Sequence, residues 1–440
     1  MTASAALALI IVVVLAAIAF FVLRSNAGPG KGGNMAPVFG TAPSIPEAIS
    51  QGNRPTLKTP NIKGWADNQT PDVAAGLKVT AFARGMEHPR WIYVLPNGDV
   101  LVAESASLPG RITQLMDLAR NFVMRRVGAI RKSANRIILL RDADGDGVPE
   151  IREVFLSGLN QPFGMALVGD TFYVGNTDSV VAYPYVEGAT RITGAGRKLM
   201  DMKPGGHWTR NLFVSHDQTK LYVGVGSLSN IAEQGFEAEV DRAAIHELDL
   251  ATGKSRIFAS GLRNAVGMAF EPTTGALWTV VNERDGLGDE TPPDYLTSVK
   301  DGGFYGWPYS YWDQIVDDRV QPANPALVAS SITPDYALGG HTASLGLAWL
   351  PDGTLNGFGA GMVIGQHGSW NRSKLSGYKV VFVAFAEGRP AGMPREILSG
   401  FLTADERSAY GRPVGVAMAA DGSLLVADDA GDTIWRVTSA

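Results

Sequence analysis

The fold class that this sequence predicts is an all-β one, a six-bladed β-propeller, and two observations predict it. The chain of 440 residues has 52 glycines and 25 prolines, a glycine share well above the usual value of about 7%. Because no collagen-like period accompanies this excess, it indicates many turns and therefore many short strands. The second observation is a hairpin-like unit that recurs six times along the chain.

Each unit has a small-residue lead, an apolar strand, a polar turn and a second apolar strand. The copies begin at Pro89, Pro162, Thr209, Ala265, Ser344 and Pro413. Their spacing, roughly 45–80 residues, exceeds the ~40–45 residues of a WD40 blade, so the insertions between strands are long. A radial array of blades leaves few exposed strand edges. The alternative, a β-sandwich, would not need six similar units.

Short signatures within the units support this interpretation. Asn-Gly or Asp-Gly pairs that favour hairpin turns stand at Asn97, Asp352 and Asp421. A glycine followed two residues later by alanine recurs in the first strand at Gly164, Gly267, Gly346 and Gly415.

The first 27 residues are expected to be a membrane anchor or a signal segment. Ala6–Leu23 holds no charge and no proline, and 18 helical residues span about 27 Å, close to a hydrocarbon core. The absence of Lys or Arg before it favours an anchor over a signal peptide, although cleavage before Gly28 is the alternative. We expect a Gly/Pro-rich linker over 28–70 and the propeller domain over 71–440. The propeller would then be membrane-anchored in the periplasm, or secreted if the segment is removed.

A short helical insertion is expected in the first blade. Apolar residues between Ile112 and Val127 fall roughly on one helical face, and basic residues cover the other. Such a helix packs against the side of the propeller or lies on an anionic membrane surface.

The segment RDADGDGVPEIRE resembles the start of a calcium loop. Asp142, Asp144 and Asp146 alternate with glycines, and Glu153 stands at position 12, where an EF-hand has its bidentate glutamate. The flanking stretches are typical of strands rather than helices. A hairpin turn without metal is therefore the competing interpretation of this candidate second calcium site.

The best candidates for chemistry stand at the starts and ends of the units, where the loops of a propeller converge on its axis. One is His207, in KPGGHWTRNL. The others are Arg263, Asn264, Arg372 and Arg412. Several arginines that converge from different blades indicate an anionic small-molecule ligand. The acidic, glycine-broken ERDGLGDE segment can turn carbonyls and carboxylates toward a hard cation.

Five segments together resemble the soluble-type pyrroloquinoline quinone (PQQ) sugar dehydrogenases, in particular the sorbosone dehydrogenase-like branch. They are GGHWTRNLFVSHD, GLRNAVGMAFEP, NERDGLGDETPPDY, HTASLGLAW and GSWNRS, and the resemblance covers about residues 75–438. It implies a six-bladed propeller with PQQ over the axis on a calcium ion. It also implies that His207 is the general base that takes the hydroxyl proton while the sugar carbon gives hydride to the quinone.

The same resemblance assigns the remaining site residues. Arg263 and Asn264 would hold the cofactor, as would Arg372 and Arg412. The backbone carbonyls of Arg284 and Asp285 would bind the calcium. Val266 stands where the glucose-oxidising members carry glutamine, so the resemblance favours an aldose or sorbosone-type substrate other than glucose.

Composition narrows the partners. The formal charge of −5 gives no basic field for nucleic acid, and the lack of cysteine excludes disulfides, Cys-ligated zinc and covalent c-type haem. Electrons would therefore pass to an external acceptor, a membrane quinone or a cytochrome. A base for this reaction is expected to have a pKa near the operating pH. Two alternatives stay open: a calcium-dependent, lactonase-like hydrolase and a membrane-tethered binding propeller without chemistry.

Overall fold

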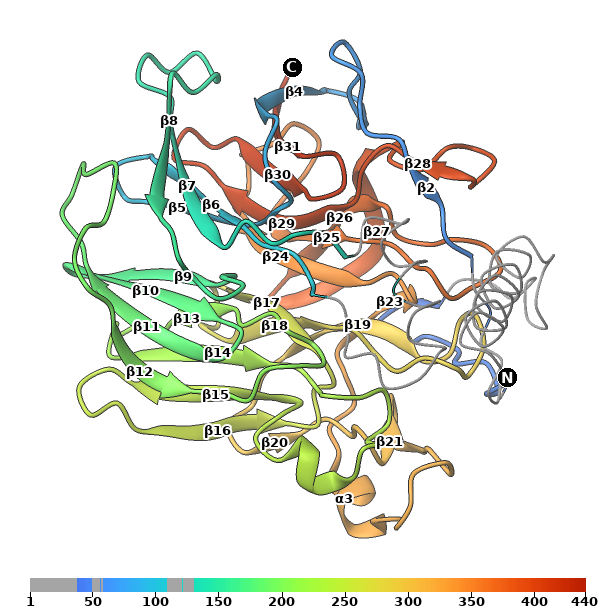
Figure 1. Ribbon diagram of the computed structural model, residues 1–440. Coiled ribbons are helices and arrows are strands. Elements are labelled where there is room, and N and C mark those ends of the chain that lie inside the picture. Colours follow the sequence, from blue (N-terminus) through green and yellow to red (C-terminus); the bar gives the residue numbers. More distant parts are fainter. Residues whose placement is uncertain (1–37, 50–55, 57, 109–120, 122–129) are drawn as a thin grey trace, which may run out of the picture.

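The computed structural model describes residues 38–49, 56, 58–108, 121 and 130–440 (Figure 1). Its strands form six antiparallel sheets with four blade strands each, so the predicted six-bladed β-propeller is confirmed. The helical elements with described bounds are the 3₁₀ helix η1 (Phe236–Glu239) and the helix α3 (Pro325–Ser330).

The first three blades follow the chain in order. Blade 1 comprises β5 (Pro89–Val94), β6 (Val100–Glu104), β7 (Arg136–Arg141) and β8 (Ile151–Leu156). Blade 2 comprises β9 (Met165–Val168), β10 (Thr171–Asn176), β11 (Ser179–Pro184) and β12 (Arg197–Asp201). Blade 3 comprises β13 (Leu212–Val214), β14 (Lys220–Val225), β15 (Ala244–Asp249) and β16 (Ser255–Ser260), with β20 (Gly303–Phe304) added in parallel.

The other three blades each take a strand from elsewhere in the chain. Blade 4 comprises β17 (Ala265–Phe270), β18 (Leu277–Val281), β19 (Pro293–Ser298) and β23 (Tyr336–Gly340), with β1 (Phe39–Gly40) at its edge. Blade 5 comprises β24 (Ser344–Leu350), β25 (Gly361–Gln366), β26 (Lys379–Ala386) and β27 (Arg389–Ser399), with β3 (Asp72–Val73) at its edge. Blade 6 comprises β29 (Pro413–Met418), β30 (Leu424–Asp428), β31 (Thr433–Ser439) and β4 (Leu77–Arg84).

The remaining strands form two small pairs outside the blades. β2 (Asn61–Ile62) runs parallel to β28 (Ser408–Ala409). β21 (Ser310–Tyr311) and β22 (Ile315–Val316) form a hairpin between β19 and β23, next to α3 in sequence.

The recurring glycine of the units lies where the inner strands of neighbouring blades meet. A Cβ atom added at Gly346 would lie 2.1 Å from the carbonyl oxygen of Val414 in the next blade. At Gly164 the same atom would lie 2.3 Å from the amide nitrogen of Leu212. Only glycine permits backbones to approach this closely, so the repeated motif marks contacts between blades.

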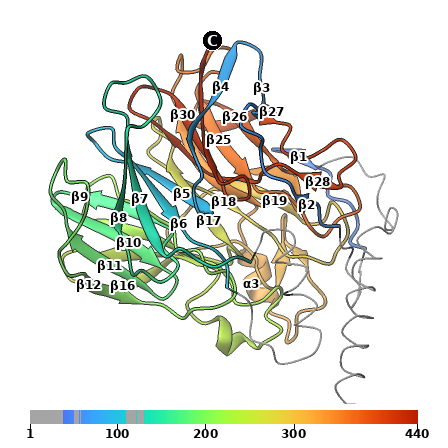
Figure 2. The ribbon, with the colours of Figure 1, turned by 45° about the horizontal axis from the view of Figure 1, so that its top comes forward.

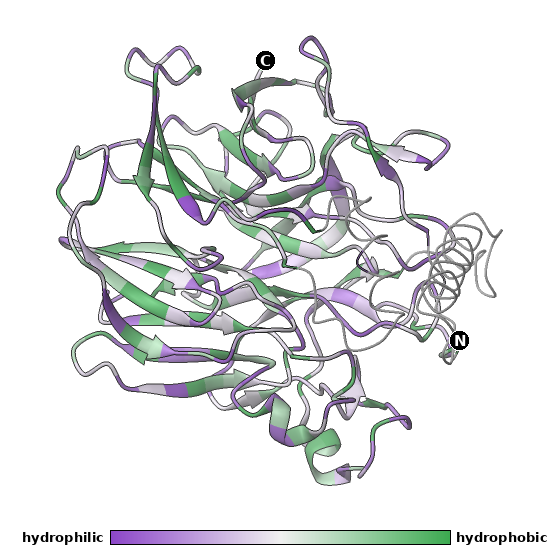
Figure 3. Ribbon diagram, viewed as in Figure 1, coloured by the Kyte–Doolittle hydropathy of each residue, from purple (hydrophilic) through white to green (hydrophobic). Residues whose placement is uncertain are grey.

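The hydrophobic core lies between the blades. Most of the larger apolar clusters join the facing sides of two neighbouring sheets, as where Trp91 of blade 1 meets Phe163 just before blade 2 with ring centroids 4.6 Å apart. Trp435 of blade 6 packs in one cluster with Phe382 of blade 5. Figure 3 shows the same division: hydrophobic residues concentrate along the strands, and hydrophilic ones in many of the connecting loops.

The ring is closed by strands from both ends of the domain. β4 pairs along its length with β31, from Thr433 opposite Arg84 to Ser439 opposite Leu77. In Figure 2 the blue β4 lies beside the dark red strands of blade 6.

Part of the stretch predicted as a linker lies on the propeller. β1 pairs with blade 4, and the Trp65 ring packs at 5.4 Å from Phe401 and at 5.3 Å from Trp435. The predicted anchor, Ala6–Leu23, and the predicted helix between Ile112 and Val127 fall almost entirely outside the described residues. No helix in the described part of the chain has the length and apolarity to cross a bilayer.

Candidate functional site

Loops from five of the blades converge on a cavity of about 310 Å³. His88 and Arg90 come from the entrance to blade 1, and His207 from the loop before blade 3. The cavity is also lined by Trp208, Arg263, Asn264, Glu283, Asp285, His341, His367, Asn371 and Arg412. The structure thus brings together His207, the Arg-Asn pair, Asp285 and the predicted blade-6 arginine.

Two predicted residues are not among those that line the cavity. The Arg372 side chain is buried, donates to the carbonyl oxygen of Gly340 at 2.8 Å and forms an ion pair with Glu290. The Arg284 side chain is buried too, with its Nη1 atom 2.8 Å from a carboxylate oxygen of Asp317. The prediction for Arg284 concerns its backbone carbonyl, whereas Arg372 would need a free side chain.

His207 is held in one tautomer by the end of β14. Its Nδ1 atom lies 2.9 Å from the carbonyl oxygen of Ser227 and 3.1 Å from the Ser227 hydroxyl. Since a carbonyl can only accept, Nδ1 carries the hydrogen and Nε2 keeps its lone pair. Burial, followed by the charge of Arg263, lowers the pKa of His207 to about 3. This pKa lies below the near-neutral value expected from the sequence, because the imidazole is buried and, to a smaller extent, because Arg263 lies nearby.

Arg263 and Asp285 form the centre of a polar network. Arg263 donates from Nη1 to the carbonyl oxygen of Glu283 at 2.7 Å and from Nη2 to Asn230 Oδ1 at 3.0 Å. The Asp285 carboxylate accepts from Asn371 Nδ2 at 2.6 Å and lies 3.3 Å from His341 Nδ1. Burial alone would raise the pKa of Asp285, but the hydrogen bond from His341 and the charge of Arg263 outweigh it and lower the pKa to about 2.

A second group, to which the sequence assigned no specific role, places His88, Arg90 and His367 on the cavity around Asp429. The buried carboxylate of Asp429 lies 2.9 Å from His367 Nε2 and 3.4 Å from His88 Nε2, and it accepts from Arg90. Burial lowers the pKa of His88 to about 4 and that of His367 to about 3. Burial would raise the pKa of Asp429, but His367, His88 and Arg90 hold it well below its usual range.

A sequence signal for two of these residues existed. His88 and Arg90 stand at the start of the first unit, the same position that Arg263 and Asn264 occupy in the fourth. Asp429 follows the second strand of blade 6 and carries no comparable signal. Glu283 was also missed; burial raises its pKa to about 7 even though Arg263 lies nearby.

Several polar atoms at this cavity have no partner within the described part of the chain. The Oδ1 atom of Asn264 is buried and accepts no hydrogen bond there. Arg412 binds the carbonyls of His367 and Gly368 through Nε and Nη2, which leaves Nη1 free. Arg90 binds through Nη1, which leaves Nη2 free. Asn264 Oδ1 is a buried acceptor of the kind that rarely stays unsatisfied, and the two guanidinium nitrogens are donors at the cavity, so together they indicate a polar, anionic ligand or water.

The oxygen atoms offered to a calcium ion are fewer than predicted. The carbonyl oxygen of Asp285 accepts from Asn230 Nδ2 at 3.0 Å. In the preceding residues, Arg263 occupies the carbonyl of Glu283. The Arg284 carbonyl accepts no hydrogen bond from the described residues, and the Asp285 carboxylate lines the cavity. Hard oxygen donors suited to calcium are thus present, although one predicted carbonyl would have to exchange its partner.

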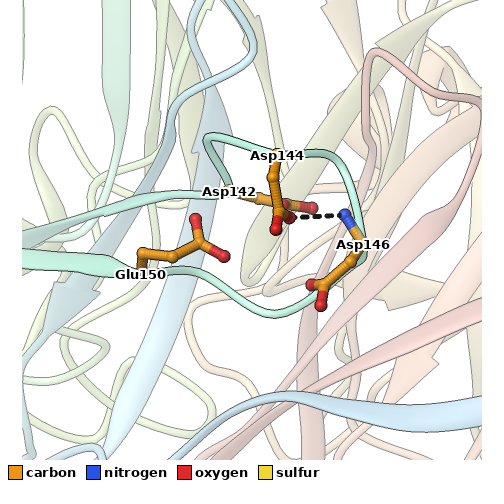
Figure 4. Close-up of side chains that lie close together, drawn as sticks. All are labelled: Asp142, Asp144, Asp146 and Glu150. Atoms are coloured by element: carbon orange, nitrogen blue, oxygen red, sulfur yellow. Dashed lines mark hydrogen bonds between the residues drawn. The ribbon is translucent and has the colours of Figure 1, made fainter.

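The acidic turn lies between β7 and β8, outside this cavity. Asp142, Asp144, Asp146 and Glu150 place one oxygen each within 4.8 Å of one another (Figure 4). Glu150 takes the place expected for Glu153, which lies in β8 with its carboxylate 3.6 Å from Arg191. Backbone N–H groups of the turn donate to these carboxylates, as Gly145 and Gly147 do to Asp142 at 2.8 Å. The turn is therefore held without a metal, and calcium binding there stays a prediction.

Comparison with known proteins adds the family. The family model described as TrAA12-like matches residues 71–295 and 312–440. A pyrroloquinoline quinone-dependent sugar dehydrogenase of Hypocrea jecorina is 26% identical over 185 residues, which cover 36% of this chain and 43% of that protein. A pyrroloquinoline quinone-dependent pyranose dehydrogenase of Coprinopsis cinerea is 23% identical over 355 residues, which cover 71% of this chain and 44% of that protein. The chain thus spans less than half the length of these two curated relatives.

Solved structures share the fold. The holo form of the PQQ domain of the Coprinopsis cinerea pyranose dehydrogenase superposes with a TM-score of 0.68 at 20% identity, covering 87% of this chain and 100% of that one. A calcium structure of a Trichoderma reesei family AA12 protein gives 0.69 at 21% identity, covering 84% and 97%. At such identities the likeness shows the propeller fold.

Proposed function

Since the chain belongs to the TrAA12-like family, we propose that its axial cavity binds PQQ with calcium and that the protein oxidises a sugar. One observation carries the proposal: guanidinium nitrogens of Arg90 and Arg412 and the Oδ1 atom of Asn264 have no partner among the described residues around one cavity. Guanidinium N–H groups without a partner suit the carboxylates of PQQ. The names of the relatives, two PQQ-dependent sugar dehydrogenases, support the same cofactor.

The residues that would hold the cofactor differ from the predicted set in one place. Arg263, Asn264 and Arg412 keep their proposed role. Arg90 takes the role expected for Arg372, because Arg372 is committed to Glu290 while Arg90 lines the cavity with a free nitrogen. Calcium would be held by the carbonyls of Arg284 and Asp285 with the Asp285 carboxylate nearby, and the calcium-containing AA12 structure supports its presence.

His207 is the proposed general base. The neutral ring, with Nδ1–H bound to Ser227, offers Nε2 to the hydroxyl proton of the sugar. When bound, PQQ would supply the two-electron acceptor for the hydride that leaves the sugar carbon bearing this hydroxyl. Arg263 and Asp285 line the wall beside the imidazole, and Arg263 keeps it neutral before the substrate arrives. An aldose or sorbosone-type sugar is the proposed substrate, and an external quinone or cytochrome the proposed electron acceptor.

Titration of the cofactor tests this proposal. Apo-protein in excess Ca²⁺ is titrated with PQQ, and the quenching of tryptophan fluorescence is followed; Trp208 and Trp370 line the cavity. We expect saturable binding at micromolar or tighter affinity, weakened by a chelator, followed by dye reduction with aldoses or sorbosone. A matched exchange, Arg412→Met against the exposed Arg407→Met, should weaken binding only for Arg412. Absence of saturable PQQ binding would refute the dehydrogenase.

The same experiment addresses the two alternatives. A lactonase-like hydrolase would need calcium but would neither bind PQQ nor reduce the dye. A binding propeller would show neither activity. Three arginines and four histidines line the cavity beside the carboxylates of Glu283, Asp285 and Asp294, and this excess of basic side chains supports an anionic cofactor, and so oxidation, over a metal-centred hydrolase.

We also propose that Ala6–Leu23 anchors the protein in a membrane with the propeller in the periplasm. An uncharged run long enough to span the bilayer supports this. Full-length protein should then sediment with membranes, and a chain that starts near Gly28 should not. Mass spectrometry of the mature N-terminus decides: a mature chain that begins at Gly28 would show a cleaved signal instead.

A further inference from the structure

Two buried arginines surround the loop that carries His207. The loop connects β12 to β13, and the side chains of Arg210 and Arg242 are 0% and 6% exposed. Arg210 lies near the end of this loop, just before β13, whereas Arg242 comes from the segment that connects β14 to β15 in the same blade. Both therefore belong to blade 3 and lie at the end of its first hairpin where β13 begins and β14 ends.

The two guanidinium groups bind the loop through its backbone carbonyls. Arg210 donates from Nη1 to the carbonyl of His207 itself at 2.7 Å and to that of Thr209 at 2.9 Å. Its Nη2 reaches the carbonyl of Lys203 at 3.0 Å. Arg242 donates to the carbonyl of Gly205 at 3.0 Å.

Arg242 extends the set on both sides of the loop. It donates to the carbonyl of Pro204 at 2.8 Å and also to that of Lys203. Its Nη1 atom also donates to the carbonyl of Gly226, the residue that follows β14, at 3.4 Å. Together the two arginines occupy carbonyls along almost the whole loop. Carbonyl oxygens here carry a charge-assisted bond, which is stronger than a neutral one.

Within the described part of the chain neither arginine has a carboxylate oxygen within ion-pair distance, and the carboxylates of Asp178 and Glu239 act on Arg210 and Arg242 from farther away. Glu239 itself accepts from the amides of Leu228 at 2.7 Å and Ser229 at 2.9 Å. The Nε atoms of Arg210 and Arg242 are buried without a described partner. Burying a cation without an anion is costly, and apolar residues of similar size would often serve packing as well.

The backbone that binds the other side of the imidazole is fixed by a carboxylate, which accepts hydrogen bonds from N–H groups where the arginines donate to carbonyls. Glu239 holds the Ser227–Ser229 turn, whose Ser227 carbonyl receives the Nδ1–H of His207. The loop also needs two glycines: Gly205 and Gly206 have φ angles of +97° and +61°. A Cβ at Gly206 would lie 2.4 Å from the Leu228 Cα atom, so the two backbones are in direct contact.

We propose that Arg210 and Arg242 are positioning residues for His207, which fix the loop by its carbonyls so that Nε2 faces the cavity before ligands bind. This inference rests on the proposed function, since it assigns a purpose to the orientation of the base. Two buried cations without a direct ion pair in the described part of the chain are hard to explain by stability alone. A flexible, glycine-containing loop with a catalytic side chain explains them, because a misplacement of about 1 Å can cost a factor of about 10² in rate.

The arginines also act on the charge state of the imidazole. The charged groups that face His207 are Arg263, Arg210 and Asp285, and the two arginines lower its pKa while Asp285 raises it. Burial and Arg242 lower the pKa of Arg210 itself to about 9, so it stays charged at neutral pH. Of the two positioning arginines, Arg210 therefore adds to burial and Arg263 in favouring the neutral ring that can accept a proton.

The test compares Arg210→Lys and Arg242→Lys with Arg256→Lys, an exposed arginine of β16 in the same blade. Lysine keeps the charge but offers a single point of donation instead of a fork. We expect the Arg210 and Arg242 variants to lower kcat about 10- to 100-fold. KM and PQQ affinity should change less than about threefold, and Arg256→Lys should behave as wild type.

A second set of measurements separates positioning from a general structural role. In a His207→Asn background, Arg210→Lys and Arg242→Lys should cause no further loss of kcat, because they act through His207. Hydrogen exchange of the apo-protein should be faster in the peptide that covers 203–212 and unchanged in the other blades. This readout needs no cofactor.

Either of two results would overturn the inference: unchanged exchange over 203–212 in both variants, or an equal loss of kcat with and without His207. Should Arg210→Lys fail to fold, Arg242→Lys decides alone, since it binds different carbonyls of the loop. A wild-type protein without PQQ-dependent activity would count against the proposed function instead. The exchange result would still show whether the arginines hold the loop.

Discussion

Replacing His207 by asparagine removes one proton acceptor and little else. The asparagine amide can still donate to the Ser227 carbonyl, 2.9 Å from Nδ1 in the present structure, so the loop contact is preserved. What is lost is the Nε2 lone pair. General-base catalysis contributes a factor of about 10²–10⁴, or about 2.7–5.4 kcal/mol at 1.36 kcal/mol per decade. We therefore expect kcat of the PQQ- and calcium-loaded enzyme to fall by that factor, with PQQ affinity nearly unchanged.

The pH profile refines this expectation. The pKa of His207 is lowered to about 3 by burial and Arg263, and the ring is active when deprotonated. Loss of activity through its protonation is thus confined to acidic pH, and kcat/KM should show no His207 limb between about pH 5 and 8. Dye reduction measured across this range in wild type and variant checks the point.

The matched control is His216→Asn. This histidine also belongs to blade 3, but it stacks on Phe270 at 3.5 Å outside the cavity, so the exchange should leave kcat within a factor of about 2. If His207→Asn keeps more than a third of the wild-type kcat, His207 is a structural residue. Glu283, whose pKa is raised to about 7 by burial, is then the better base, because Asp285 favours the protonated form of His341.

Three further predictions concern stability. Asp429→Asn should lower the free energy of unfolding, measured in urea, by about 3–5 kcal/mol, because it leaves the buried Arg90 uncompensated. The exposed control Glu396→Gln should change this free energy by less than about 0.5 kcal/mol. Similar values for both variants would contradict the role of the buried carboxylate. The pKa of His88 is about 4 in the folded protein and 6.5 in the unfolded chain, so the stability that depends on its neutral ring is complete above pH 6.5 and is lost as the pH falls toward 4. His88→Asn should therefore make the decline of the free energy of unfolding with acid shallower by up to about 1.4 kcal/mol per pH unit. An unaltered slope would refute this. Gly346→Ala should destabilise by about 1–3 kcal/mol because its Cβ meets the next blade, whereas Gly359→Ala, with only an ordinary contact at 3.7 Å, should be neutral; equal melting temperatures would argue against the close approach.

The six blades could be predicted from the sequence because each repeats the same short pattern of strand and turn residues. The apolar strands, the Asn-Gly and Asp-Gly turns and the recurring glycines all reflect neighbours along the chain or the same contact repeated. The glycine at 346 is an example: its reason, the approach to Val414, lies in the next blade, but repetition made it visible. The edge strand β4 was harder, since a strand pattern does not say which sheet it joins.

The site was predicted in position but less well in its partners. His207, Arg263 and Arg412 reach the cavity because blade entrances converge on the axis, a property of the fold. An arginine side chain can point into the cavity or pair with a buried carboxylate, and one contact with a residue distant in sequence decides between the two. Arg372 pairs with Glu290, 82 positions away, and no local pattern reveals that choice. Asp429 escaped notice for the same reason, since its three partners come from other blades.

The pairing of β4 with β31 sets the order of events during synthesis. Leu77–Arg84 is synthesised about 350 residues before its partner strand, Thr433–Ser439. Until that partner is made, blade 6 is incomplete, and the residues that line the axis cannot be brought together from all sides. A chain that stops before residue 433 would carry an unpaired strand edge and no finished cavity, so a ligand of this cavity can bind only after blade 6 has closed.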